Sequence, residues 1–203
     1  MIKIAAFILP QKKTRLKILG FKKKVKKKFG AQPYLSHPPH CTLFTMNVSN
    51  QILKFKKNFK SINIKSNYKN TLLIKKTGIF ANDPITSGKT IYFKITKTSF
   101  LQSLQLELLR SFIKFNNNKR KIKFKFSWMN KNNKKYGYPF VGKTWIPHFT
   151  VASLVNVNKD KKFIKNFLNK KIKSDELIKK IYIYKINKDK HIYLWSINIK
   201  LIK

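Results

Sequence analysis

The spacing of apolar residues along the chain predicts a mixture of strands and helices. Apolar residues alternate with polar ones, or run together over a few positions, in segments typical of β-strands. These segments are residues 2–10, 61–77 (one or two strands), 91–95, 122–128, 181–186 and 192–201. In residues 122–128 the alternating partners are mostly lysines, so this strand is expected to have one basic face; its apolar members are Ile122, Phe124, Phe126 and Trp128.

Helical spacing is clearest over residues 12–29. The apolar residues that recur there are Ile18, Phe21, Val25 and Phe29, and Gly30 follows as a C-terminal stop. The lysine runs 22–24 and 26–28 fall largely on the opposite face, which we interpret as the solvated side of the helix.

A second helix is predicted to begin at Ser99, through a capping box with Gln102, and to end before Asn116. Its buried stripe is expected to be Leu101, Leu104, Leu108 and Phe112. The remaining elements expected are short helices at residues 50–59 and 159–168, a turn near Asp175, and turn-rich connections at residues 77–90 and 129–145.

One five-residue pattern occurs twice, each time at the start of a predicted strand. It reads Pro39-His40-Cys41-Thr42-Leu43 and later Pro147-His148-Phe149-Thr150-Val151. Side chains alternate between the two faces of a strand, so the His and Thr of each copy share one face. The residue between them and the aliphatic residue that follows point into a core. Each copy therefore presents an imidazole beside a hydroxyl.

The order strand, helix, histidine strand, helix and strands is followed by a broadly similar set of elements. We therefore expect an α+β protein with two pseudo-symmetric lobes of antiparallel β-sheet, helices on the outside and a central catalytic cleft. At 203 residues the chain suits a single domain over residues 1–203 that buries a sizeable core.

Composition narrows the class of protein. Apolar residues make up 42% and aromatic residues 14% of the chain, which argues against disorder. Cys41 is the one cysteine, so no internal disulfide can form. The apolar stretch at residues 4–9 is too short for a signal peptide, and no run is long enough for a membrane helix. These features predict a soluble, cytoplasmic protein.

The net charge of +41 predicts a polyanionic partner. All but three of the 47 basic residues are lysine, and Ile, Asn, Phe and Tyr are also abundant. Those residues have AT-rich codons, so base composition accounts for much of the lysine. The charge still far exceeds the magnitude of about 2 to 8 usual for a small soluble domain.

Two histidines facing one phosphorus atom suit phosphodiester chemistry. An imidazole can accept or donate a proton near neutral pH, so one histidine can activate water while the other protonates the departing ribose oxygen. The threonine hydroxyls can hydrogen-bond the non-bridging oxygens, where charge builds up. No carboxylate lies beside either motif in the sequence, so we expect no metal and no cofactor.

The paired motifs resemble those of the two-histidine (2H) phosphoesterase superfamily, and most closely its 2′-5′ RNA ligase-like / cyclic phosphodiesterase branch. The first strand with its helix and the final pair of strands match that family's layout. The resemblance implies a catalytic set of His40, Thr42, His148 and Thr150, and opening of a 2′,3′-cyclic phosphate to the 2′-phosphate. The same geometry in reverse would ligate. Many ligase-like members carry an arginine after the second motif, where this chain has Ala152-Ser153.

Other interpretations of these residues remain open. The histidines could be core or capping residues that share a tripeptide by chance, and a zinc site could be formed by His37, His40, Cys41 and one distant histidine. Cys41 is expected to be buried rather than nucleophilic, and His191 to be exposed. As a whole, the protein could be an RNA-binding module with an inactive cleft, or a small cyclic nucleotide phosphodiesterase.

Aromatic residues near the motifs are candidates for substrate binding. Tyr34, Tyr138 and Trp145 could stack a nucleobase, although packing in the core is an equally good interpretation of each. The 129–145 connection is expected to act as a substrate-selecting lid. The expected partner is RNA or a nucleotide with a 2′,3′-cyclic phosphate, with no membrane involved and with the protein as a monomer.

Overall fold

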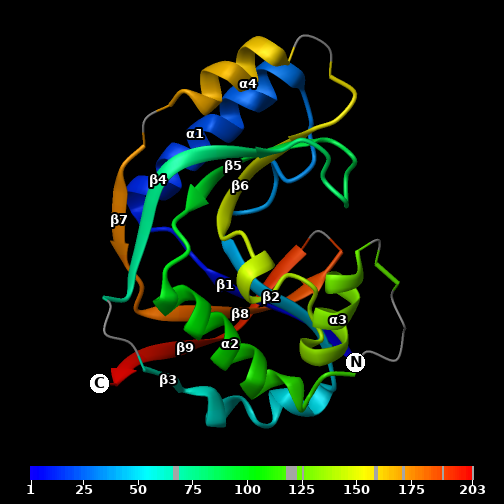
Figure 1. Ribbon diagram of the computed structural model, residues 1–203, viewed down its shortest axis with the longest axis vertical. Helices are drawn as coiled ribbons and strands as arrows, with labels where there is room; N and C mark the ends of the chain where they lie inside the picture. Colours follow the sequence, from blue (N-terminus) through cyan, green and yellow to red (C-terminus); the bar gives the residue numbers. More distant parts are fainter. Residues whose placement is uncertain are drawn as a thin grey trace.

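The computed structural model describes residues 1–65, 69–117, 123–124, 126–157, 160–170, 172–188 and 190–202, and its strands form two sheets (Figure 1). The five-stranded sheet has the order β2-β1-β8-β9-β3. Its strands are β1 (Ile2–Ile8), β2 (Cys41–Val48), β3 (Ser61–Lys65), β8 (Lys180–Asn187) and β9 (Lys190–Ile202). The four-stranded sheet has the order β6-β5-β4-β7. Its strands are β4 (Thr71–Phe80), β5 (Lys89–Ile95), β6 (His148–Leu154) and β7 (Ser174–Leu177).

The pairing is antiparallel between these strands except for β3 and β9, which are parallel. The helices are α1 (Lys12–Phe29), α2 (Ser99–Ile113), α3 (Ser127–Tyr136) and α4 (Lys161–Leu168), with short 3-10 turns η1 (Asn50–Leu53), η2 (Lys56–Phe59) and η3 (Gly142–Thr144). This α+β arrangement of two sheets with outer helices confirms the predicted fold class.

The two lobes exchange their helices. Helix α1 follows β1 of the five-stranded sheet but packs on β6 of the other, next to α4 (Figure 1). Helix α2 follows β5 of the four-stranded sheet but packs on β2 and β3. Each histidine strand thus closes a strand–helix–strand unit, β1-α1-β2 or β5-α2-β6, whose helix lies on the opposite lobe. The buried apolar side chains of both lobes form one continuous cluster.

Both histidine strands carry a β-bulge at the same position of the motif. Between β1 and β2 the register skips Leu43, and between β5 and β6 it skips Val151. Each is the aliphatic residue that follows the threonine. A bulge adds one unpaired residue and sharpens the local twist of the strand. The two copies of the motif therefore share a backbone irregularity as well as their residue types.

The prediction for residues 122–145 is wrong in most of its length. Helix α3 spans Ser127–Tyr136, where the end of a basic strand and a loop were expected. The side chain of Asn130 bonds both the N–H (2.8 Å) and the carbonyl (2.9 Å) of Phe124, which turns the chain back toward the helix instead of extending it. Gly137, at φ 68°, ends the helix in the left-handed conformation. Ile122 lies outside the described residues.

Smaller corrections concern element ends. Strand β4 continues through Gly78 to Phe80, into the predicted 77–90 connection, and the turn expected near Asp175 is the edge strand β7. The cap of α2 is Thr98, whose Oγ1 accepts from the Leu101 N–H at 3.3 Å, one residue before the predicted Ser99. Residues 50–59 form η1 and η2 instead of one α-helix.

Among the described residues, no helix has the length and the apolar character needed to cross a membrane.

Candidate active site

Both motifs line one cleft, of about 640 Å³, to which the two sheets contribute. His40 and Thr42 reach it from the start of β2 in the five-stranded sheet, and His148 and Thr150 from β6 in the four-stranded sheet. The four side chains are half-buried, whereas Cys41, Leu43, Phe149 and Val151 are buried in the core. The alternation predicted from strand geometry is therefore correct. The volume is typical of a small-molecule site.

The two imidazoles are held in the same way. Nδ1 of His40 lies 2.7 Å from the carbonyl oxygen of Pro38, and Nδ1 of His148 lies 2.7 Å from that of Ile146. A carbonyl can only accept, so Nδ1 carries the proton and Nε2 is the basic nitrogen of each neutral ring. In both motifs a proline follows the residue that supplies the carbonyl. Proline restricts the preceding residue to extended conformations, which fixes the direction of that carbonyl.

Aromatic rings from the neighbouring strands support each imidazole. Phe7 stacks on His40 with ring centroids 4.0 Å apart, and Tyr92 lies 5.0 Å from His148. Phe7 pairs with the threonine of the first motif and Tyr92 with that of the second, so the two supports occupy equivalent positions. A third ring, Phe80, lies edge-on to His148 at 5.1 Å.

Two further histidines and a lysine lie near His40. The His191 ring lies 5.1 Å from it and 4.9 Å from the His37 ring, so three histidines lie together. Burial lowers the pKa of His40 well below its usual value, and His191, His37 and Lys22 lower it further against the effect of the Pro38 carbonyl. His191 was expected to be exposed, but it is half-buried against His40.

A carboxylate lies on the side of His148. Asp83 lines the cleft and is 6% exposed. Its Oδ2 accepts from the hydroxyl of Thr90 (2.6 Å) and that of Tyr34 (3.4 Å), and its Oδ1 accepts from the amide of Ile85 (2.8 Å). Burial lowers the pKa of His148, whereas the Ile146 carbonyl and the Asp83 charge act to raise it. No carboxylate lies beside either motif in the sequence, and Asp83 reaches the cleft only through the fold.

Lys22 is the second functional candidate that the sequence did not reveal. It lines the cleft and is 5% exposed, whereas the lysine runs of this helix were expected to be solvated. Its position explains the error: it falls between the buried Ile18 and Val25 on the core-facing stripe of α1. A charged residue at core spacing was the available signal. Its ammonium donates to the Tyr34 carbonyl.

The predicted stacking residues all line the cleft, but they differ in exposure. Trp145 is 3% exposed and its Nε1 donates to the Thr42 carbonyl at 3.1 Å, so it ties the segment before the second motif to the first motif. Tyr138 is 9% exposed and packs against Phe140. Tyr34 is half-buried. Trp145 and Tyr138 thus present little surface on which a base could stack.

Two buried groups fix the position of the cleft's walls. The side chain of Gln105, on α2, donates to the carbonyls of Leu43 (2.9 Å) and Phe140 (3.0 Å) and accepts from the Gly142 amide (3.1 Å). The buried Cys41 thiol has a raised pKa because of desolvation, with a hydrogen bond from the backbone of His148 acting against the rise. The two motifs are therefore in direct contact through their core sides.

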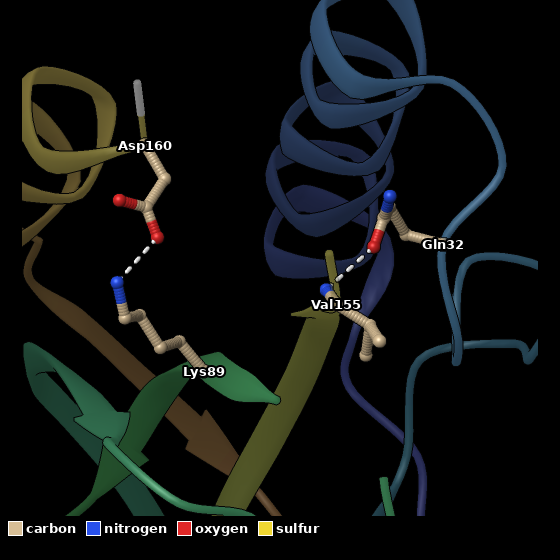
Figure 2. Close-up of polar contacts among 4 residues, drawn as sticks. All are labelled: Gln32, Lys89, Val155 and Asp160. Atoms are coloured by element: carbon tan, nitrogen blue, oxygen red, sulfur yellow. Dashed lines mark hydrogen bonds and ion pairs between the residues drawn. The ribbon is translucent and has the colours of Figure 1, made fainter. Parts of the chain in front are cut away.

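The 31–39 loop is fastened to the end of β6. Gln32 Oε1 accepts from the Val155 amide at 2.8 Å, as Figure 2 shows, and the Pro33 carbonyl accepts from the Ser153 amide at 3.1 Å. These bonds hold Tyr34 and His37 beside the cleft. Ala152 and Ser153, which follow the second motif, are fully buried.

The described residues contain no group of three or more His, Cys, Asp or Glu side chains placed to hold a metal ion, so the zinc alternative gains no support.

Comparison of the chain with protein-family models and with curated proteins finds no match. Solved structures do match over nearly the whole chain. TT0787 of Thermus thermophilus is 12% identical with a TM-score of 0.63, and each chain covers 97% of the other. E. coli LigT complexed with 3′-AMP is 13% identical with a TM-score of 0.53, over 97% of this chain and 98% of that one. A phosphoesterase structure, also 13% identical, has a TM-score of 0.52 with the same coverage.

At these identities the likeness concerns the fold. The chain therefore has the bilobal fold of LigT and TT0787, which is the fold that its resemblance to the two-histidine phosphoesterases implies.

Proposed function

We propose that this protein is a two-histidine phosphoesterase that opens 2′,3′-cyclic phosphates at the end of RNA or of a nucleotide with water, or joins such an end to a 5′ hydroxyl as a 2′-5′ linkage when that hydroxyl takes the place of water. The observation that carries this proposal is the matched pair of imidazoles in one cleft, each with Nδ1 bonded to a backbone carbonyl and Nε2 left basic. The fold shared with LigT and with a phosphoesterase supports the reaction class.

In the proposed hydrolysis, Nε2 of one histidine removes a proton from water as the water oxygen bonds to phosphorus. The bond between phosphorus and the 3′ oxygen breaks, and the other imidazolium gives its proton to that oxygen. Thr42 and Thr150 donate hydrogen bonds to the non-bridging oxygens, which gain charge in the transition state. Acid, base and anion contacts are thus supplied by side chains, so the step needs no metal or cofactor.

The surroundings of the histidines favour one assignment of roles. Burial, with a smaller effect of the neighbouring His191, His37 and Lys22, holds His40 neutral and suits it to act as the base. His148 faces Asp83, whose charge favours the imidazolium and suits His148 to act as the acid. A bound phosphate anion would offset the effect of burial on His148 and so couple its protonation to substrate binding.

The proposed substrates are RNA ends or free nucleotides. E. coli LigT has been crystallised with 3′-AMP, which supports a nucleotide in this cleft. The net charge of +41 favours RNA over a small nucleotide, because lysines outside the cleft could contact phosphates upstream of the reacting end.

The test is turnover of nucleoside 2′,3′-cyclic phosphates and of a short RNA ending in one, with EDTA present. We expect His40→Ala and His148→Ala each to lose at least about 100-fold in kcat/KM. Lys23→Ala, at an exposed position of α1, serves as the control and should keep most of the activity.

The outcomes separate the alternatives. Turnover that survives either motif substitution would refute the two-histidine mechanism. Absence of turnover by the unmodified protein, with salt-sensitive RNA binding that both substitutions leave unchanged, would favour an RNA-binding module with an inactive cleft. Turnover restricted to mononucleotides would favour a small cyclic nucleotide phosphodiesterase.

A further inference from the structure

Lys22 differs from the other lysines whose contacts the structure describes. It lies on the core-facing stripe of α1, is 5% exposed and borders the cleft on the side of His40. Burial lowers its pKa to about 8, so the side chain still carries its charge at neutral pH. The molecule therefore holds an ammonium ion in a largely desolvated position beside the proposed catalytic base.

No carboxylate neutralises this charge among the described residues. Their ion pairs join Lys89 to Asp160 and Arg110 to Glu107. Figure 2 shows the first pair, in which a half-exposed lysine reaches a carboxylate at 2.8 Å. Lys22 is more buried, yet its acceptor is the neutral Tyr34 carbonyl. A buried charge without a counter-ion is unfavourable, so its retention at a cleft indicates that an anionic ligand supplies the counter-charge.

The backbone around Tyr34 is shaped for this contact. Tyr34 has a φ of 69°, in the left-handed region that non-glycine residues rarely adopt. In this conformation its carbonyl accepts from Lys22 while its hydroxyl donates to Asp83. Strained residues of this kind persist where the surrounding structure requires them, often at ligand sites. The carbonyl leaves Lys22 with further N–H donors for a ligand, since an ammonium has three.

We propose that Lys22 binds a non-bridging phosphate oxygen of the ligand on the His40 side of the cleft. The identity of the ligand as a phosphate rests on the proposed function. Asp83, on the His148 side, repels anions, so the charged oxygens are directed toward Lys22 and the uncharged hydroxyls of the ligand toward the carboxylate. Lys22 thereby sets the orientation of the ligand between two otherwise similar motifs.

The test is the affinity for inorganic phosphate and for 3′-AMP, measured by titration calorimetry at pH 7 and fixed ionic strength. Lys22→Met keeps the length of the side chain and removes its charge, and we expect it to weaken both ligands roughly 10- to 100-fold, the loss typical of one charge-assisted hydrogen bond. Lys23→Met, at the next position on the exposed face, is the matched control and should leave both affinities within about twofold.

A second measurement uses the unmodified protein and so does not depend on the folding of Lys22→Met. The side-chain nitrogens of the lysines are labelled with isotope and followed by NMR. The Nζ signal of Lys22 is identified as the one that is missing from the spectrum of Lys22→Arg. Added phosphate should shift this signal and leave those of the exposed lysines of α1 unchanged. Equal phosphate affinity in the unmodified protein and Lys22→Met, or an unshifted Lys22 signal at saturating phosphate, would overturn the proposal.

Failure of this proposal and failure of the proposed function give different results. Loss of phosphate binding in Lys22→Met, together with no turnover by the unmodified protein, would support Lys22 as an anion site and refute the enzyme. Normal turnover with unchanged phosphate affinity in the variant would support the enzyme and refute the role of Lys22.

Discussion

Replacing Lys22 with methionine should make the protein more stable at pH 7. A fall in the pKa of this lysine from 10.5 to about 8 on folding corresponds to an unfavourable contribution of about 3 kcal/mol when the group is protonated. Methionine removes that contribution and extends the apolar stripe between Ile18 and Val25. The variant also loses the hydrogen bond to the Tyr34 carbonyl, which costs about 1 kcal/mol. The free energy of unfolding should therefore increase by about 2 kcal/mol in total.

The pH dependence has a definite sign. Between pH 8 and 10.5 the folded protein binds fewer protons at Lys22 than the unfolded chain does, so the stability of the unmodified protein relative to the variant rises with pH in this window. Urea unfolding of both proteins at pH 7, 8, 9, 10 and 10.5 measures this difference. Lys23→Met, an exposed position, should change stability by less than about 0.5 kcal/mol. A destabilised Lys22→Met, or a difference that does not change with pH, would refute a buried, uncompensated ammonium.

Three further perturbations test the site's supports. Gly78→Ala would place a Cβ 2.5 Å from the ring of Tyr92, so this ring must shift and its contact with His148 is disturbed. We expect kcat to fall, and the free energy of unfolding to fall by about 1 to 3 kcal/mol. Folding lowers the pKa values of His40 and His148, so their neutral forms favour the folded state. This contribution to stability is fully present above about pH 6.5 and is lost as the pH falls below that value, which a series of Tm measurements against pH will show. Gln105→Leu leaves the carbonyls of Leu43 and Phe140 and the amide of Gly142 without this partner, and urea unfolding should show a loss of about 2 to 4 kcal/mol.

Matched controls separate these effects from general damage. Gly20→Ala, where nothing lies within 4 Å of the new Cβ, should stabilise α1 slightly; if it lowers kcat as Gly78→Ala does, contact with Tyr92 is not the cause. Gln102→Leu makes the Gln105 substitution one turn earlier on the same helix and should change stability little. Parallel Tm curves for the unmodified protein and His40→Gln between pH 7 and 4 would contradict the assigned shift in the pKa of His40.

The motif strands and the long helices could be predicted because local patterns decide them. The alternation around His40 and His148 fixed which side chains face the cleft, and the spacing from Ile18 to Phe29 gave α1 its observed bounds, residues 12–29. Residues 122–145 could not be predicted in this way, since a side-chain bond from Asn130 to the backbone overrides the alternation of the preceding aromatic residues.

The charged residues of the site escaped prediction for a different reason. Asp83 lies far from both motifs along the chain and reaches the cleft because the 81–88 connection returns between β4 and β5. Lys22 is hidden among many similar lysines in the sequence, and only its place on the buried stripe distinguishes it. The motifs therefore supplied the side chains proposed to react, whereas the charged residues that differ between the two halves are brought to the cleft by the tertiary structure.

The paired bulges at Leu43 and Val151 bear on what sets the orientation of a phosphate bound in the cleft. Because both half-sites are built by the same backbone irregularity, a phosphate could enter either way round with similar contacts to the motif residues. Exchanging the charged residues beside the two motifs should then make His40 the proton donor and His148 the proton acceptor, without any change in the motifs. Which histidine acts as the acid and which as the base would then depend on residues such as Lys22 and Asp83, and could change in evolution while the two matching motifs stay the same.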